Sequence, residues 1–343
     1  MNKRVLIPLA LTLLLAGACA KNDASTTGQD AQEYLKLWME DHHPGVTPNE
    51  DGLYILQDLP GTGDTWDSEK PYILADLTIR ALSGTISSTT HENLAKQLGT
   101  YVKGYYYGPK YQMTGSDVSY AGLDALLKGM RVGGTRKAVI PAWMLTTNRF
   151  STQQEYINAC SVSTSLIYEL SLIGQSENPE KDAIAMLKTY VKEHYGAEVT
   201  PVSYVTGEEA DGSFWFISDA SGFDGKDPLP SSATIKIHYT GSLLNGTVFD
   251  TTLEKVAKDN GIYKAGNKYQ SASINYNTNY QNITMGSSSS LISGFKGGLS
   301  LMRWKGQKAT VLFTSQHGYS TSGSGSTIPS YAPLIFELEI LDE

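Results

Sequence analysis

Basic residues are scarce in this chain of 343 residues. Lys and Arg number 27 against 35 Asp and Glu, which leaves a formal net charge of −8. Proteins that bind nucleic acids take much of their affinity from Lys and Arg on phosphates, so this balance argues against nucleic acid as a partner. The content of 40% hydrophobic and 18% charged residues indicates a globular protein instead, with length for two domains of ordinary size.

Motifs for metal binding and nucleophilic catalysis are also lacking. The six histidines form no His-Glu-x-x-His pair and no zinc spacing with cysteine. No Gly-x-Ser-x-Gly elbow offers a nucleophile for hydrolase chemistry. We therefore expect neither a metal nor a cofactor.

The N-terminal residues have the form of a secretory leader. Lys3 and Arg4 precede an apolar stretch over residues 5–15, which is too short to span a bilayer, and small residues then lead into Cys19. This order resembles the lipobox of bacterial lipoproteins, although Ala16 stands where that motif usually has leucine. The resemblance implies cleavage before Cys19, acylation of its sulfur, and a membrane anchor in the cell envelope, at the outer membrane on its periplasmic or surface face.

Cysteine is nearly absent from the rest of the chain. With Cys19 acylated, Cys160 is the one cysteine left, and an internal disulfide is excluded. We expect Cys160 to be a buried structural thiol, because no base lies near it in the sequence. Residues 20–30 are small and polar and predict a flexible tether, and residues 174–181 predict a flexible joint.

The chain repeats itself after the tether. Residues 76–101 match residues 238–263 without a gap at an offset of 162, and 11 of the 26 pairs are identical. An amphipathic helix is predicted ahead of each copy, over residues 31–42 and 182–195. Two copies are too few for a solenoid, so we predict two independent domains in tandem.

Periodicity predicts the elements of the second copy. Ile235, Ile237 and Tyr239 alternate with polar residues, as in a half-buried strand. Residues 334–340 predict another strand, and residues 291–301 a short helix bracketed by glycines. The expected class is α+β, with each domain an antiparallel sheet wrapped on one short helix and preceded by an amphipathic helix. The predicted boundaries are a signal peptide at 1–18, a lipid-anchored tether and helix at 19–46, a first domain at 47–174, a linker helix at 175–204 and a second domain at 205–343.

Several motifs in the second copy follow one another in a recognisable order. They are His238-Tyr239-Thr240-Gly241, Gly246-Thr247-Val248-Phe249-Asp250, Met285-Gly286, Leu291-Ile292-Ser293-Gly294-Phe295, Leu299-x-x-Met302, Gly318-Tyr319 and Ile328-Pro329. This series resembles the FKBP family of peptidyl-prolyl cis-trans isomerases over about 110 residues. About 30 residues rich in Tyr, Asn and Ser between Asp250 and Ile283 make a connection longer than is usual in that family.

The resemblance implies a proline pocket and assigns its residues. The catalytic positions would be Tyr239, Phe249, Asp250, Ile292, Phe295, Tyr319 and Phe336, and the substrate-binding positions Ile283, Leu291 and Ile328. The Tyr319 hydroxyl and the Ile292 N–H would hold substrate carbonyls. The clients would be proline-containing segments of exported polypeptides.

The first copy keeps the scaffold but lacks these pocket residues. Leu77, Ser87 and Ser88 stand where the second copy has Tyr239, Phe249 and Asp250, and Leu123 stands at the Phe295 position. The first domain is therefore predicted to be a degenerate, catalytically silent copy. An alternative for the whole chain is a non-catalytic envelope lipoprotein that reuses the fold, with Tyr263, Tyr269, Tyr276 and Tyr280 presenting aromatic surface to peptide or glycan.

Overall fold

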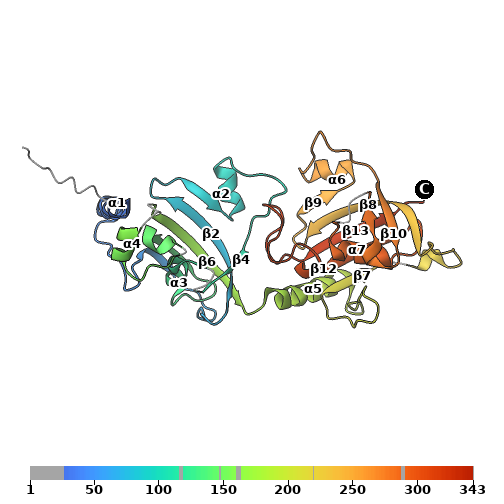
Figure 1. Cartoon of the computed structure of the whole chain (residues 1–343), viewed down its shortest axis with the longest axis horizontal. Coiled ribbons are helices and arrows are strands. Elements are labelled where there is room, and N and C mark those ends of the chain that lie inside the picture. The colour runs from blue at the N-terminus through green and yellow to red at the C-terminus, as the bar shows by residue number, and fades with distance from the viewer. Residues whose placement is uncertain are drawn as a thin grey trace, which may run out of the picture.

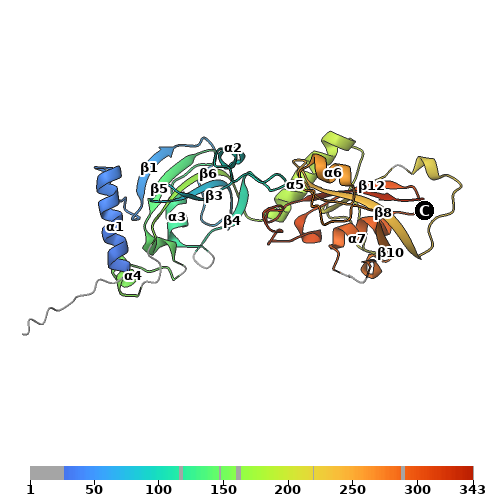
Figure 2. The same ribbon diagram turned by 90° about the horizontal axis from the view of Figure 1, so that it is seen from above.

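Two lobes follow one another along the molecule, each built on its own sheet (Figures 1 and 2). The computed structural model describes residues 27–115, 119–146, 148–159, 164–218, 220–286 and 290–342, so Cys19 and Cys160 lie outside the described residues. We call residues 27–176 the N-terminal lobe and residues 179–342 the C-terminal lobe. The strands of both sheets pair antiparallel, which confirms the predicted mixture of helices with two antiparallel sheets.

The N-terminal lobe opens with a helix and closes with its longest strand. Its elements are α1 (Thr27–His42), β1 (Tyr54–Leu59), β2 (Tyr72–Ala81), β3 (Ile86–Thr89), α2 (Glu92–Gln97), β4 (Lys110–Met113), α3 (Ala121–Leu127), β5 (Thr135–Ile140), the 3-10 helix η1 (Ala142–Leu145), α4 (Gln153–Ala159) and β6 (Leu166–Ser176). The strand order is β1-β5-β6-β2-β3, with β4 also paired to β2.

The C-terminal lobe repeats this plan. Its elements are α5 (Pro179–Tyr195), β7 (Phe214–Ile217), η2 (Ser221–Phe223), β8 (Ser232–Leu243), β9 (Val248–Thr251), α6 (Glu254–Asp259), β10 (Ala272–Asn277), η3 (Tyr280–Asn282), β11 (Thr284–Met285), α7 (Ser293–Leu301), β12 (Lys308–Phe313), η4 (Ser315–His317) and β13 (Leu334–Ile340). The strand order is β11-β10-β8-β13-β12-β7, with β9 also paired to β8. Among the described residues, no helix combines the length and the apolar character that a membrane span requires.

The sequence repeat is also a repeat of structure. Strands β3 and β9, and helices α2 and α6, begin and end at residues separated by the offset of 162. A threonine pair joins the two strands in each lobe, Thr78 to Thr89 and Thr240 to Thr251, with the hydroxyl oxygens 2.9 Å apart in both. The same local contacts therefore support β2–β3 and β8–β9.

Alternation along the C-terminal strands supplies two apolar faces. Val311 and Phe313 of β12 belong to the main core, against which α7 packs. Leu312 points to the other face and packs with Leu187 and Val191 of α5. Each successive residue of a strand points to the opposite side of its sheet, so the predicted leading helix covers one face while the short helix covers the other.

Helix α7 sits close to the sheet because glycine leaves room there. A Cβ atom built on Gly298 would lie 2.7 Å from a methyl carbon of Val311. A side chain at this position would push the helix away from β12. The helix axis is thus set by a backbone-to-side-chain contact, and the residues at its N-terminus are fixed relative to the sheet.

Two segments that the sequence predicted to be flexible contain regular structure. Helix α1 begins at Thr27, inside the segment expected to be a tether. The expected joint at 174–181 is also wrong, because β6 runs to Ser176 and α5 starts at Pro179. Asn178 caps α5 by accepting hydrogen bonds from the N–H groups of the two residues after Pro179, and proline is favoured in a first helical turn.

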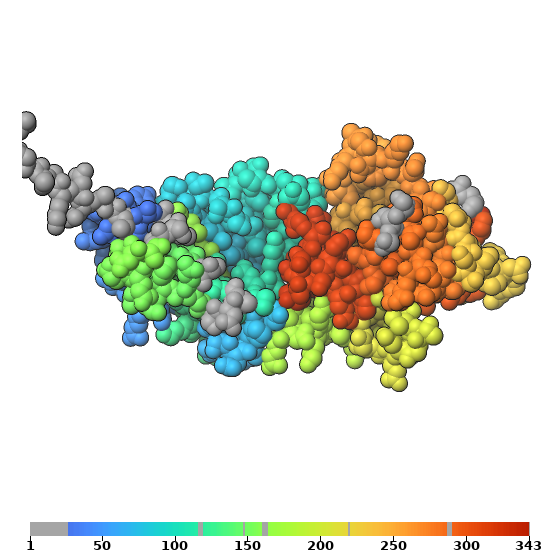
Figure 3. Space-filling view, in the orientation of Figure 1, coloured from blue at the N-terminus to red at the C-terminus, as the bar shows by residue number. Residues whose placement is uncertain are grey.

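The two lobes are in contact with each other (Figure 3), and tyrosines make several of the contacts between them. The N–H of Tyr106 donates to the carbonyl of Ser326 at 2.9 Å. The Tyr111 hydroxyl donates to the Asp182 carboxylate at 3.0 Å. The ring of Tyr331 makes edge contacts with the rings of Tyr72 and Tyr111, at centroid distances of 5.4 and 5.8 Å.

Candidate functional site

Strands β8 and β9 bring Tyr239, Phe249 and Asp250 to one end of the C-terminal sheet. The Tyr239 hydroxyl donates to the Asp250 carboxylate at 2.8 Å. Burial raises the pKa of Tyr239, and the neighbouring carboxylate raises it further. The hydroxyl therefore stays protonated and keeps its role as the donor in this pair.

Four of the predicted rings form one cluster. Phe295 of α7 contacts Tyr239 and Phe336 at centroid distances of 5.3 and 5.2 Å, and Phe249 contacts Phe336 at 5.6 Å. All three pairs are edge-to-face, the arrangement that aromatic rings prefer. Phe295 and Phe336 are nearly inaccessible, while Tyr239 and Phe249 are half-buried. The cluster thus has a closed floor and two partly open walls.

The remaining predicted positions lie around this cluster at different depths. Ile292 is the N-cap residue of α7 and, like Leu291, is half-buried. Tyr319 follows η4 and packs against the same core. Burial raises the pKa of Tyr319 and the Asp250 carboxylate adds to the shift, so this hydroxyl too remains a donor.

Ile328 and Ile283 lie in the hydrophobic core and not at the surface of the ring cluster. Ile328 is 4% exposed and Ile283 is fully buried. Both belong to the core cluster that carries the rings. Ile283 therefore supports the wall from behind, and we do not expect it to touch a ligand.

A network that the sequence did not reveal holds the segment before Tyr319. His317 lies between two hydroxyl groups, with Nδ1 2.8 Å from the Tyr204 hydroxyl and Nε2 2.8 Å from the Ser213 hydroxyl. Burial lowers the pKa of His317, although Asp211 and Glu180 act in the opposite direction. The partners are more than 100 residues apart in sequence, so no local motif could have indicated this contact.

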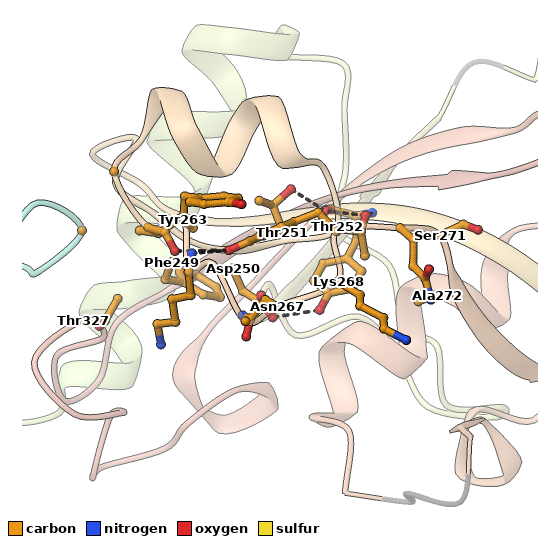
Figure 4. Close-up of a pocket in the computed structure, with 18 of the residues that line it drawn as sticks. Phe249, Asp250, Thr251, Thr252, Tyr263, Asn267, Lys268, Ser271, Ala272 and Thr327 are labelled. Carbon is orange, nitrogen blue, oxygen red and sulfur yellow. Dashed lines mark hydrogen bonds between the residues drawn. The ribbon is translucent and has the colours of Figure 1, made fainter.

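A cavity of about 940 Å³ opens beside the ring cluster. Tyr239, Phe249 and Asp250 form part of its lining, together with the loop that follows α6. Figure 4 shows Phe249 and Asp250 next to each other, with Asn267 and Lys268 on one side and Thr327 on another. The ring cluster is thus reached from an open cleft that is large enough for several residues of a peptide.

The long connection after Asp250 has an ordered structure. Tyr263 and Tyr269 stack at a centroid distance of 5.2 Å, and the Tyr269 hydroxyl accepts from the N–H of Lys264 at 2.9 Å. The N-terminal lobe has the same arrangement, in which Tyr101 and Tyr107 stack at 5.3 Å. The segment is therefore a feature of the repeat. We call residues 101–107 and 263–269 the tyrosine loops.

The predicted aromatic surface is smaller than the sequence suggested. Tyr276 is 1% exposed, and its hydroxyl donates to the carbonyl of Met302 at 2.8 Å. The ring of Tyr280 packs edge-on against Tyr204 at 4.8 Å. Tyr276 thus belongs to the core, and the expectation that it presents surface to a ligand is wrong.

In the N-terminal lobe the corresponding space is filled by aliphatic side chains. Leu77 and Leu123, at the positions of Tyr239 and Phe295, are buried in its core. Ile79 occupies the strand position at which the C-terminal lobe has Gly241. Ile79 pairs with Ser88 of β3, and Gly241 pairs with Asp250 of β9, which corresponds to Ser88. In the N-terminal lobe the branched side chain of Ile79 packs against the core. In the C-terminal lobe the lack of a side chain at Gly241 leaves room for the ring of Phe249.

Comparisons with known proteins converge on one family. Residues 225–341 match the family model for FKBP-type peptidyl-prolyl cis-trans isomerase. A protein of Haemophilus influenzae named "Probable FKBP-type peptidyl-prolyl cis-trans isomerase" is 30% identical over 116 residues, which cover 34% of this chain but 37% of that protein. An FK506-binding protein of Neisseria meningitidis serogroup B is 33% identical over 107 residues, which cover 31% of this chain and 76% of that protein.

The chain is also similar to a solved structure. The peptidyl-prolyl cis-trans isomerase of Pseudomonas syringae pv. tomato is 19% identical, covers 48% of this chain and 96% of its own, and superposes with a TM-score of 0.29.

Proposed function

The chain belongs to the family of FKBP-type peptidyl-prolyl cis-trans isomerases, and from that premise we propose that its C-terminal lobe accelerates rotation about X-Pro bonds in exported polypeptides. The reaction would take place over the cluster of Tyr239, Phe249, Phe295 and Phe336, which we call the cup. The observation that carries the proposal is the edge-to-face contact of Phe295 with Tyr239 and Phe336, within 5.3 Å, beneath an open cleft.

An apolar cup can catalyse this rotation without a nucleophile or a base. The planar amide is conjugated and dipolar, and its rotation barrier is about 20 kcal/mol. The twisted transition state has lost conjugation and much of that dipole. Removal from water therefore penalises the ground state more than the transition state, and this difference in binding lowers the barrier.

Polar groups at the rim would hold the peptide in place. The Tyr319 hydroxyl and the Ile292 N–H are proposed to donate to substrate carbonyls on either side of the proline. Asp250 would lie near the twisting carbonyl and is held by the Tyr239 hydroxyl. Because the pKa values of Tyr239 and Tyr319 are both raised, both hydroxyls are available as donors throughout the neutral range.

Substitution of the cup tests this proposal. A protease-coupled assay on a short proline peptide should show acceleration by the parent chain, and a loss of tenfold or more in kcat/KM for Phe249→Ala and Asp250→Ala. Ser88→Ala is the matched control, since Ser88 occupies the position of Asp250 in the N-terminal lobe and is exposed. A parent that leaves the uncatalysed rate unchanged refutes the proposal, and so does equal activity in all four proteins.

We further propose that Cys19 carries a lipid that anchors the chain to the cell envelope, where exported clients fold. The support is the order of basic, apolar and small residues before Cys19, and the gain of about 0.8 kcal/mol per buried methylene makes several acyl chains a firm anchor. Cys19→Ser should move the protein from the membrane fraction to the soluble fraction of a Gram-negative host. Unchanged membrane association would contradict the anchor without affecting the isomerase proposal.

A further inference from the structure

The cleft beside the ring cluster carries an excess of positive charge. Its described lining residues include Lys103, Lys236, Lys264 and Lys268, and among them only Asp250 carries a carboxylate. These five residues give the lining a formal charge of +3, whereas the whole chain has a formal charge of −8. The cleft is thus a basic site on an acidic protein.

The lysines of this cleft are available to a ligand. Lys236, Lys264 and Lys268 are exposed, and none of them takes part in an ion pair with another described residue. Lys103 donates to the carbonyl oxygen of Asp259 at 2.6 Å, so its ammonium is held at the edge of the cleft. Asp250 is engaged by the Tyr239 hydroxyl and neutralises only part of the charge.

Both lobes contribute to the cleft. Residues 102–105 of the first tyrosine loop face the cavity from the N-terminal lobe, and residues of the second tyrosine loop face it from the C-terminal lobe. A Cβ atom on Gly104 would lie 2.5 Å from Ile262, so the two loops are in close contact. The hydrogen bond from Tyr106 to Ser326 also ties the first loop to the segment that carries Thr327, on a further side of the cavity.

We propose that this two-lobe cleft binds the residues that flank the target proline and selects client segments with Asp or Glu next to that proline. The inference rests on the proposed isomerase function and names the substrate class of the same site. Ammonium groups along a groove attract carboxylates, favour their encounter and disfavour cationic segments. The N-terminal lobe, whose own cup is filled, then serves the reaction as one wall of the client site.

Three matched peptides test the charge preference. Each has one central Leu-Pro bond, flanked on both sides by Glu, Gln or Lys, and exchange between its cis and trans forms is followed by NMR with the full chain. At low ionic strength the Glu peptide should have a kcat/KM about tenfold above that of the Gln peptide, and the Lys peptide should fall below it. The difference should appear mainly in KM, because the flanking charges are bound equally in the ground and transition states. It should shrink in about 0.5 M salt, where the Debye length is only a few ångströms.

Substitutions assign the preference to the cleft. Lys236→Gln/Lys264→Gln/Lys268→Gln should bring the ratio between Glu and Gln peptides close to one, and Lys264→Glu/Lys268→Glu should turn the preference toward the Lys peptide. The control Lys181→Gln/Lys188→Gln/Lys192→Gln changes net charge by the same amount on exposed positions of α5 and should keep the parent ratio.

The outcomes separate this inference from the function on which it rests. If the parent accelerates the Gln peptide but treats all three alike, the charge selection is wrong and the isomerase remains. If the control variant loses the ratio as the cleft variant does, the preference comes from net charge and the cleft assignment is wrong. If the parent accelerates none of the peptides, the isomerase proposal fails, and with it the substrate class.

Discussion

The Tyr239 hydroxyl and the Asp250 carboxylate, on neighbouring strands, are joined by a hydrogen bond of 2.8 Å. The pair lies where the ring cluster meets the cavity, so one carboxylate is held at the edge of an apolar surface. A free carboxylate there would be able to rotate toward water. The hydroxyl instead fixes its position next to the proposed path of the substrate carbonyl.

Removal of this hydroxyl should weaken catalysis while the protein stays folded. Tyr239→Phe keeps the ring that contacts Phe295 but leaves Asp250 without its donor. We expect kcat/KM to fall about three- to tenfold, while the free energy of unfolding changes by about 0.5–1.5 kcal/mol. Peptide kinetics and urea unfolding measure the two effects. A variant with unchanged kcat/KM would show that the position of Asp250 does not matter to the reaction.

Space at Gly241 should be essential for the cup. A Cβ atom there would lie 2.6 Å from the Phe249 ring and 2.9 Å from the Phe336 ring, so Gly241→Ala must displace both. Overpacking of this kind costs about 1–3 kcal/mol, which a folded domain tolerates. We expect a folded protein with activity reduced tenfold or more, as judged by circular dichroism and the coupled assay. Gly222→Ala, where a Cβ atom meets nothing within 4 Å, is the control and should retain activity.

The buried imidazole of His317 should make stability depend on pH in a defined window. Its pKa is lowered in the folded state by burial, whereas in the unfolded chain it is about 6.5. Above that value the group is neutral in both states and has no effect on the pH slope. Below it the unfolded chain binds the proton first, so the free energy of unfolding decreases until the pH passes the folded pKa.

The comparison of parent with His317→Gln isolates this contribution from that of the other histidines. Urea unfolding between about pH 7.5 and 5 should show a smaller loss of stability for the variant than for the parent. Parallel curves would mean that the protonation of His317 is not linked to folding.

Local patterns in the sequence were sufficient for many elements. The strand predicted at residues 334–340 is β13, because alternation there reflects two environments on the two faces of one sheet. The start of α5 could have been predicted as well, since Asn178 followed by Pro179 carries both a capping signal and a first-turn signal. The polar composition of that segment indicated a joint instead, because composition does not report capping geometry.

The site could be predicted only in part. The order of motifs identified the four rings, which the structure brings together, but single aromatic residues cannot be distinguished from ordinary core packing by sequence alone. The contacts of His317 with Tyr204 and Ser213 depend on the approach of distant segments. The charge of the cleft depends in the same way on the approach of the tyrosine loops from two lobes, which no local pattern encodes.

The cup itself is tested most directly by the rate of cis-trans exchange in a short proline peptide, measured by NMR with the parent chain and with Phe336→Leu. This substitution keeps an apolar side chain but removes the ring that contacts Phe249 and Phe295. The account predicts that the parent shortens an exchange time of tens of seconds by a hundredfold or more, and that the folded variant loses at least nine-tenths of that acceleration. Exchange no faster with the parent than in buffer, or equal acceleration by both proteins, would contradict it.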